Sequence, residues 1–327
     1  MILVVNLNAS VDKRYKMKEL INGRVMRADE VENTPGGKGI HVANVATILG
    51  ENCIVTGFLG GKTGEFIEEK LVEYSIKNDF VKIDGDTREC LAIITEDLIQ
   101  TEILEPGPVV SLEEQNKFLL KYKELIKDSN IVVASGSVPR NVSKDFYYEL
   151  ITIANNNEKK FLLDASGELL AEGIKAKPFF VKPNRDEIEA LTGRIIKNDE
   201  DAIEEIVKIQ RNGVELVVIS LGSKGSVAGY EGKFYKVTVP KIEAVNPVGS
   251  GDAYVSGVAI ALERGYEIKE LLRYASACGT ANAIEEKTGS LKESVVNELL
   301  EAIKVEDLSW WQAHELWLIV YRNILKQ

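Results

Sequence analysis

The segment NPVGSGD, which ends at Asp252, combines a glycine-rich turn with a carboxylate at the start of a helical pattern over residues 253–262. A turn of Gly249, Ser250 and Gly251 that opens a helix leaves backbone N–H groups without partners. Together with the helix dipole, these groups attract an anion such as phosphate. An ionised Asp252 beside that phosphate could accept the proton of an attacking hydroxyl. The structural alternative is an acidic residue that only stabilises the first helical turn.

A second glycine-rich turn, PGGKG, leads into a helical pattern over residues 40–49. Gly36 and Gly37 have no Cβ and would let a substrate approach the backbone closely. Lys38 supplies a positive charge for a phosphate group. An ordinary glycine-rich turn before a helix explains the same spacing, so this motif gains weight only together with the others.

A third motif, KPNRDE, places Asn184 at a predicted helix start and Glu187 three residues later. This spacing is typical of a capping box, in which each side chain bonds to the other residue's backbone N–H group. A carboxylate near phosphates would also hold Mg²⁺, through water molecules because Mg²⁺ dehydrates reluctantly. Both interpretations can hold at once, and we expect Asn184 and Glu187 to form the metal site.

Short apolar segments alternate with helical patterns along most of the chain, which predicts a mostly parallel sheet with helices on both faces. The predicted strands cover residues 1–7, 53–57, 131–135, 160–164, 179–182 and 215–220. The further predicted helices cover residues 64–74, 112–127, 144–155, 200–211, 250–264, 268–286 and 292–304. The residues predicted to follow strands directly are Asp12, Asn184, Gly222 and Asn246. We expect the site at this end of the sheet, because right-handed crossovers place ligands there.

Two segments, residues 15–34 and 88–105, have strand-like patterns without a helix of their own. We expect antiparallel ribbons that are too small to hold a core and that cover a pocket or a partner's ribbon. Ordinary surface hairpins are the alternative. The predicted organisation is an α/β core over residues 1–11, 36–86 and 107–307, with a β-lid over residues 12–35 and 87–106. Residues 308–327 form an atypical tail that contains all three tryptophans.

The composition is that of a globular protein. The 327 residues include 45% hydrophobic and 28% charged side chains, and the net charge of −11 argues against a basic surface for nucleic acid. Three cysteines without close spacing predict neither disulfides nor a zinc site. No basic segment precedes the first apolar strand, and the apolar run over residues 316–321 is too short to cross a bilayer. We therefore expect a cytoplasmic protein without a membrane partner.

Four motifs occur in sequence: GGKG at residues 36–39, KPN with Glu187, SLGSKG at residues 220–225 and GSGD at residues 249–252. With these motifs, the chain resembles the phosphofructokinase-B-type carbohydrate kinases of the ribokinase superfamily over about residues 1–307. The resemblance implies a ribokinase-like three-layer α/β sandwich with a mostly parallel central sheet and a small antiparallel β-lid. It also implies ATP and Mg²⁺ as cofactors, and a homodimer in which the lids of two subunits pair.

Three segments resemble tagatose-6-phosphate kinases within this family: TREC at residues 87–90, TEILEPG at residues 101–107 and NPVG at residues 246–249. The resemblance implies ATP-dependent phosphorylation of a ketohexose monophosphate, with D-tagatose 6-phosphate converted to D-tagatose 1,6-bisphosphate. The alternative within the family is 1-phosphofructokinase activity on fructose 1-phosphate. A non-catalytic sugar-phosphate-binding protein is a more distant alternative. The presence of Asp252 argues against it, because binding alone needs no base.

The resemblance also implies a general base, Asp252, and an anion hole of Gly249, Ser250 and Gly251. The sugar phosphate would be bound by Asp12, Gly36, Gly37, Lys38, Arg88 and Ser137, with Arg27 reaching the site of the partner subunit. The nucleotide would be bound by Lys182, Asn184, Ser220, Gly222, Gly225 and Asn282. His41 stands where relatives usually carry Asn, and it is expected to contact the sugar or, alternatively, to pack at the helix start.

Overall fold

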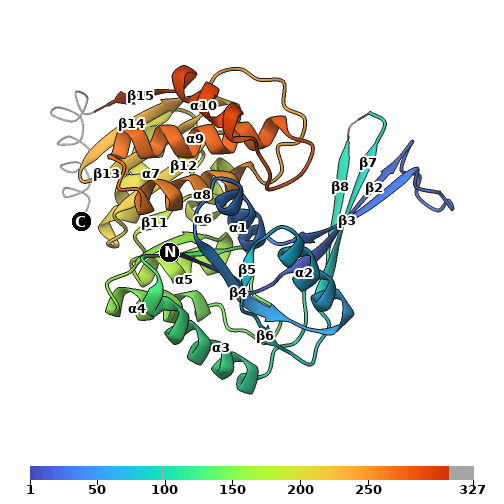
Figure 1. Ribbon diagram of the computed structural model, residues 1–327. Helices are drawn as coiled ribbons and strands as arrows, with labels where there is room; N and C mark the ends of the chain where they lie inside the picture. Colours follow the sequence, from blue (N-terminus) through green and yellow to red (C-terminus); the bar gives the residue numbers. More distant parts are fainter. Residues whose placement is uncertain (98, 309–327) are drawn as a thin grey trace.

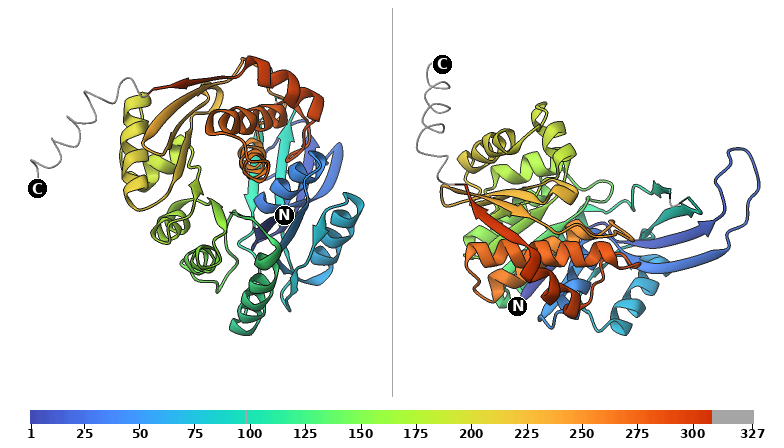
Figure 2. Two further views of the ribbon diagram at one scale, coloured as in Figure 1. Left: turned by 60° about the vertical axis from the view of Figure 1, so that its left-hand side comes forward. Right: turned by 90° about the horizontal axis from the view of Figure 1, so that it is seen from above.

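The central strands are apolar because both faces of their sheet are covered. In β1 (Ile2–Asn6), Ile2 and Val4 belong to one hydrophobic cluster, while Leu3 and Val5 belong to a second cluster on the opposite face. All four side chains are fully buried. The computed structural model describes residues 1–97 and 99–308, and Figures 1 and 2 show the arrangement of their helices and strands.

In the described part of the chain, the larger sheet has eleven strands, and its pairing changes from parallel to antiparallel toward one end. Its path runs through β15 (Lys304–Asp307), β14 (Lys233–Thr238), β13 (Ser226–Tyr230), β12 (Leu216–Ser220), β11 (Phe180–Val181), β10 (Lys160–Asp164), β9 (Ile131–Ser135), β1, β4 (Cys53–Leu59) and β5 (Lys77–Asn78). One further strand, β6 (Val81–Lys82), pairs with β4. Pairs from β12 to β5 are parallel, whereas β13, β14 and β15 pair antiparallel. The expected mostly parallel sheet is confirmed, and its three antiparallel edge strands are an addition to it.

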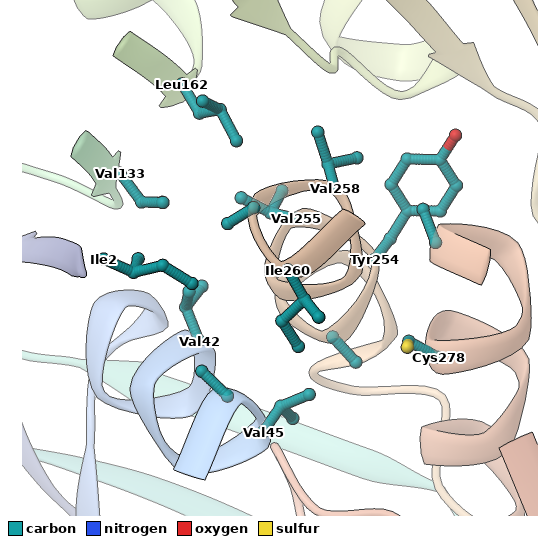
Figure 3. Packing of buried hydrophobic residues seen from close by; sticks show 14 of the residues in the cluster. Ile2, Val42, Val45, Val133, Leu162, Tyr254, Val255, Val258, Ile260 and Cys278 are labelled. Carbon is teal, nitrogen blue, oxygen red and sulfur yellow. The ribbon is translucent and has the colours of Figure 1, made fainter. Parts of the chain in front are cut away.

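Helices cover both faces of this sheet, and the two hydrophobic clusters identify which helix lies on which face. The first face carries α1 (Lys38–Ile48), α2 (Gly61–Glu73), α8 (Ser250–Glu263), α9 (Ile268–Ile284) and α10 (Glu293–Ala302). The second face carries α3 (Leu112–Leu125), α4 (Phe146–Asn156), α5 (Gly167–Lys175), α6 (Arg185–Thr192) and α7 (Asp199–Arg211). Figure 3 shows part of the first cluster, where side chains of α1, α8 and α9 converge with those of β1, β9 and β10. The three-layer α/β sandwich is therefore confirmed.

The smaller sheet, which we call the lid, has four strands and projects from the body at the right of Figure 1. Its order is β3 (Glu30–Gly36), β2 (Ser10–Met17), β7 (Arg88–Thr95) and β8 (Gln100–Leu104). The pairs β2–β3 and β7–β8 are antiparallel, as expected for two ribbons. The central pair β2–β7 is parallel, so two ribbons from distant parts of the chain join side by side in one sheet.

Two expectations about strand ends are wrong. Asp12 does not follow a core strand but lies inside β2, because the chain leaves β1 through a short turn and enters the lid at Ser10. Asn246 lies in the connection between β14 and α8, well beyond the end of β14, because that strand ends at Thr238. No helix among the described residues is long and apolar enough to cross a membrane. The tail that the sequence singles out lies, apart from Leu308, outside the described residues.

Candidate active site

A cleft of about 1450 Å³ lies where the carboxyl ends of the parallel strands meet the lid. Asn6 and Asn8 line it at the end of β1, and Gly136 and Ser137 line it just after β9. Because β1 lies between β4 and β9, the connections on its two sides diverge at this point, which is where open α/β sheets bind ligands. Lid residues, including Asp12 and Arg88, form another part of the lining.

The start of α8 forms an open end that faces this cleft. Gly249 precedes the helix with a φ of +83°, and as a glycine it offers no side chain to cap the first turn. Gly249, Ser250 and Gly251 all line the cleft. A Cβ at Gly251 would lie 3.3 Å from Nζ of Lys182, so a larger residue would crowd this lysine. The glycine turn, the free end of the helix and the lysine together fit a phosphate group.

Asp252 lies in the first turn of α8 and is only 5% exposed, yet it lines the cleft. Its Oδ2 is 2.9 Å from Nδ1 of His41. The other ring nitrogen of His41, Nε2, is 3.6 Å from Oδ2 of Asp12, and Ser10 donates a hydrogen bond of 2.7 Å to Oδ1 of that carboxylate. Burial lowers the pKa of His41, but the hydrogen bonds and charges of Asp12 and Asp252 outweigh burial and raise it to about 10. The predicted base and a predicted sugar ligand are thus joined through one imidazole.

Asp164, at the end of β10, is a further buried carboxylate in the cleft that the sequence motifs did not identify. Its oxygens lie 3.3 Å from Nζ of Lys38 and 3.7 Å from Nζ of Lys182, and Ser135 donates a hydrogen bond of 2.9 Å. Burial disfavours the charged carboxylate, but Lys182, Lys38 and Ser135 outweigh it and lower the pKa of Asp164 to about 2. Asp164 in turn raises the pKa of Lys38. The signal in the sequence that could have identified Asp164 is its position at the carboxyl end of a predicted strand.

The predicted sugar-phosphate residues lie mainly where the lid joins the core. Arg88 donates two hydrogen bonds to the carbonyl oxygen of Asn8, at 3.2 and 3.1 Å, and one of 2.8 Å to that of Glu105. Ser137 Oγ accepts a hydrogen bond of 3.0 Å from the amide of Asn8. Arg27, in contrast, is exposed in the connection between β2 and β3 and lies outside the cleft lining of its own chain.

The two glycines of the PGGKG turn are required for close packing within the protein. A Cβ at Gly36 would lie 2.1 Å from Cγ of Asp12, and Gly36 itself is outside the cleft lining. Gly37 lines the cleft with a φ of +104°, and a Cβ there would lie 2.7 Å from the amide nitrogen of Asn6. Of the two glycines, only Gly37 therefore lines the cleft, whereas the Asp12 carboxylate occupies the space beside Gly36.

The predicted nucleotide residues form the opposite part of the cleft, with one exception. Lys182, Asn184, Ser220, Gly222 and Gly225 line it. Gly222 and Gly225 adopt φ values of +60° and +83° around a short 3₁₀ turn, which only glycine accommodates readily. Asn282 is the exception, because it is fully buried behind the glycine turn at the start of α8 and is not part of the cleft lining. Its amide donates 2.9 Å to the carbonyl of Val248, so it supports the turn and does not touch the cleft.

The capping box at the start of α6 is confirmed. The backbone N–H of Asn184 donates 2.8 Å to Oε2 of Glu187, and the N–H of Glu187 donates 2.8 Å to Oδ1 of Asn184. Both residues also line the cleft. Within residues 1–97 and 99–308, no group of three or more His, Cys, Asp or Glu side chains could enclose a metal ion. The lone Glu187 carboxylate fits Mg²⁺, a hard cation that keeps several waters and takes further oxygens from phosphates.

Comparison with known proteins gives consistent matches. The profile of the pfkB family carbohydrate kinases matches residues 3–294. A tagatose-6-phosphate kinase of Staphylococcus epidermidis is 39% identical over 308 residues, which cover 93% of this chain and 99% of that protein. The crystal structure of phosphofructokinase-2 from Escherichia coli with substrates and products is 25% identical, with a TM-score of 0.85, and covers 92% of this chain and 98% of its own. A ribokinase from Arabidopsis thaliana, 20% identical with a TM-score of 0.76 and coverages of 92% and 98%, shares the fold.

These matches agree with the arrangement of the cleft. The matched residues include both glycine-rich turns, Asp252 and the capping box of α6. Residues of each of these motifs line one cleft, at the point where the connections on the two sides of β1 diverge. The chain belongs to the pfkB family of carbohydrate kinases.

Proposed function

We propose that this protein uses ATP to phosphorylate a ketohexose monophosphate, and that its substrate is D-tagatose 6-phosphate. The observation that carries this proposal is the position of Asp252. Its carboxylate lines the cleft in the first turn of α8, directly after the open glycine turn that fits a phosphate. A group that binds an anion and a group that accepts a proton are thus adjacent, as phosphoryl transfer to a hydroxyl requires.

In the proposed reaction, the C1 hydroxyl of the sugar forms a bond to the γ-phosphorus of ATP while the bond from this phosphorus to the leaving ADP oxygen breaks. Asp252 accepts the hydroxyl proton. The N–H groups of Gly249 and Gly251 would stabilise the negative charge on the transferred group, and that of Ser250 would do so in place of its hydrogen bond of 3.3 Å to the carbonyl oxygen of Pro247. Mg²⁺, held through Glu187 and with Asn184 beside it, would neutralise charge on the phosphates of the nucleotide.

The remaining cleft residues suggest where each substrate binds. The sugar phosphate would lie on the lid side, with its phosphate near Lys38, Arg88 and Ser137 and its hydroxyls near Asp12, Gly37 and His41. The nucleotide would lie along Lys182, Asn184, Ser220, Gly222 and Gly225. Asp164 would act indirectly, because it fixes the lysines on which both phosphate sites depend.

The proposed substrate is supported by the relatives. The protein from S. epidermidis is named a tagatose-6-phosphate kinase, and one crystal structure of E. coli phosphofructokinase-2 contains fructose 6-phosphate. Both of these sugars carry their phosphate at C6, so the new phosphate would be transferred to C1. A site that distinguishes two C4 epimers gains only a few kcal/mol from one hydroxyl, and we expect appreciable activity on fructose 6-phosphate as well.

We also propose a homodimer that forms through the lids. Val31, Ile103 and Leu104 are apolar side chains on lid strands, and each is more than half exposed. The outer edges of β3 and β8 are unpaired within the four-stranded sheet, and a second subunit would cover them. Arg27, which is exposed on its own subunit, would then be available to the partner's site. The buried, unpaired cysteines agree with a cytoplasmic protein.

Replacement of the base tests the reaction. We expect Asp252→Asn to lower kcat by at least ~10²-fold, while the dissociation constant of the sugar phosphate changes by less than about threefold. Asp145→Asn is a suitable control, because Asp145 lies at the start of another helix, α4, is exposed and makes no side-chain capping bond. If Asp252→Asn keeps more than about a tenth of the wild-type kcat, Asp252 is not the base.

A substrate panel tests the sugar. ADP release would be followed with tagatose 6-phosphate, fructose 6-phosphate and fructose 1-phosphate, and we expect tagatose 6-phosphate to give the highest kcat/KM. If fructose 1-phosphate is preferred by about tenfold or more, which is ~1.4 kcal/mol in transition-state binding, the protein is a 1-phosphofructokinase. If one sugar phosphate binds tightly and none is phosphorylated, the protein is a binding protein without this activity.

A further inference from the structure

His41 lies between two carboxylates of the cleft, and each of its ring nitrogens faces one of them. Nδ1 is 2.9 Å from Oδ2 of Asp252, and Nε2 is 3.6 Å from Oδ2 of Asp12. A neutral imidazole has one N–H group and one lone pair, so one of these carboxylates would face a lone pair. A protonated ring carries N–H groups at both nitrogens, and nearby negative charges favour this form. The geometry therefore fits an imidazolium better than a neutral ring.

The surrounding elements hold the ring in this place. Asp252 approaches from α8 and Asp12 from the lid strand β2. In the loop after α9, a Cβ at Gly289 would lie 2.6 Å from Cβ of His41, and Asn44 holds the Gly289 carbonyl with a hydrogen bond of 2.8 Å. His41 is only 9% exposed, and rotation of its ring would break at least one of these contacts.

The positively charged side chains in this part of the cleft do not replace the two carboxylates as partners of the ring. Lys38 lies one turn earlier on α1 and is paired with Asp164. Lys287, in the loop after α9, is a further charged residue of the cleft lining. If His41 were neutral, Asp12 and Asp252 would bring two negative charges to the place where a phosphorylated, anionic sugar must bind. A positive His41 removes half of that charge.

We propose that His41 is a positively charged positioning residue that holds Oδ2 of Asp252, couples this base to Asp12, and leaves Oδ1 of Asp252 to the acceptor hydroxyl. This inference rests on the proposed function, because Asp252 is the base only in that reaction. In this role His41 exchanges no proton with the substrate. It fixes the direction of the base, and it lowers the repulsion that the sugar phosphate meets. A side-chain amide at this position could bond to one carboxylate but would carry no charge.

The charge of His41 can be observed directly, without substrate or activity. The chain has only two histidines, His41 and His314, so ¹⁵N-histidine labelling gives two sets of ring signals. Spectra of His314→Gln would assign them. We expect both ring nitrogens of His41 to keep imidazolium shifts at pH 8, about 1.5 units above the ordinary histidine pKa. A His41 ring that is neutral at pH 8 would overturn the inference.

Kinetics of His41→Asn and His41→Gln test the positioning role. We expect kcat to fall by about tenfold or more, because a misdirected base reduces the rate strongly, while KM for ATP stays within about threefold. KM for the sugar phosphate should rise. Because the pKa of His41 is raised to about 10, its charge is present below that pH and is lost above it. The ratio of wild-type to His41→Asn kcat should therefore fall as the pH approaches 10.

The possible failures are distinguishable. If wild-type protein phosphorylates no sugar, the proposed function fails, and the role of His41 in that reaction fails with it. If wild-type protein is active, Asp252→Asn is inactive, and His41→Asn keeps kcat within about twofold at every pH, only the inference on His41 is overturned. A variant that loses ATP affinity and sugar affinity equally would indicate a purely structural residue, and it would also overturn the inference.

Discussion

Replacement of Asp164 by Asn should destabilise the protein strongly and in a pH-dependent way. Asp164 is 3% exposed and lies between Lys38 and Lys182, while Ser135 donates to the same oxygen that Lys38 approaches. Asparagine keeps the size of the side chain but removes its charge. Lys182 is also buried, and Asp164 is the anion that faces its ammonium group. The substitution would remove this partner.

The size of the effect follows from the pKa of Asp164. This pKa is lowered from 3.8 to about 2 in the folded protein. Each unit is worth ~1.4 kcal/mol, so the charged form of Asp164 contributes ~2–3 kcal/mol to the free energy of unfolding. Loss of one partner of a buried pair costs ~3–5 kcal/mol, because the remaining charge stays uncompensated. We therefore expect Asp164→Asn to lower the free energy of unfolding by about 3 kcal/mol at pH 7.

The sign of the pH dependence is fixed by the direction of the pKa shift. Because folding lowers the pKa of Asp164, the stabilisation is complete above pH 3.8 and is lost as the pH falls toward 2. Urea unfolding of wild-type and Asp164→Asn protein should thus differ by a constant amount between pH 7 and pH 5. The difference should shrink below pH 4.

An exposed ion pair provides the control for this experiment. Glu113 and Lys117 lie 2.8 Å apart on α3, and both side chains are more than half exposed. Glu113→Gln should change the free energy of unfolding by less than about 0.5 kcal/mol. A loss below about 1 kcal/mol in Asp164→Asn would refute the reasoning. So would a loss that is as large at pH 3.5 as at pH 7, since it would then not depend on the charge.

Three further predictions concern the packing of α8, the assembly and the end of the chain. A Cβ at Gly257 would lie 2.7 Å from the Cα of Ala275, so Gly257→Ala should lower the free energy of unfolding in urea by ~1–3 kcal/mol. In the control Gly173→Ala, the new Cβ meets the movable end of the Leu163 side chain, and the loss should be smaller; equal losses in the two variants would contradict this. The proposed dimer should lose activity on dilution below its dissociation constant, and a fully active monomer in sedimentation would disprove it. A chain that ends at Leu308 keeps β15 paired with β14 and should retain the wild-type kcat; loss of activity in a folded truncated protein would show that the tail matters.

The sequence predicted those parts of the site that local chemistry determines. The helix that begins at Ser250 and the capping box of Asn184 and Glu187 each depend on residues within one helical turn. Asp164 could not be assigned in this way, because its partners Lys38 and Lys182 come from distant segments that only the folded sheet brings together. The charge on His41 has the same origin, since Asp252 is far from it in the chain.

The errors have physical reasons of the same kind. The resemblance places Asn282 at the nucleotide, whereas its amide donates to the carbonyl of Val248 inside the protein. The resemblance places Gly36 beside the sugar, whereas the carboxylate of Asp12 fills the space that its missing side chain leaves. The sequence patterns of β13, β14 and β15 are short. Their antiparallel pairing includes β15, which is distant from β13 and β14 in the chain, so the local sequence does not reveal it. The strong alternation of strands and helices, in contrast, was sufficient to predict the three layers.

The parallel pairing of β2 with β7 has a consequence for the order in which the two sheets form during synthesis. During synthesis β2 leaves the ribosome early, but its neighbour β7 follows only after α1, β4, α2 and β6. A two-stranded hairpin is marginally stable by itself in water, so β2 and β3 must wait for the core to bring β7 beside them. The formation of the lid therefore depends on the core. Among the described residues, the lid should be the first sheet to exchange its amide hydrogens when the molecule opens locally.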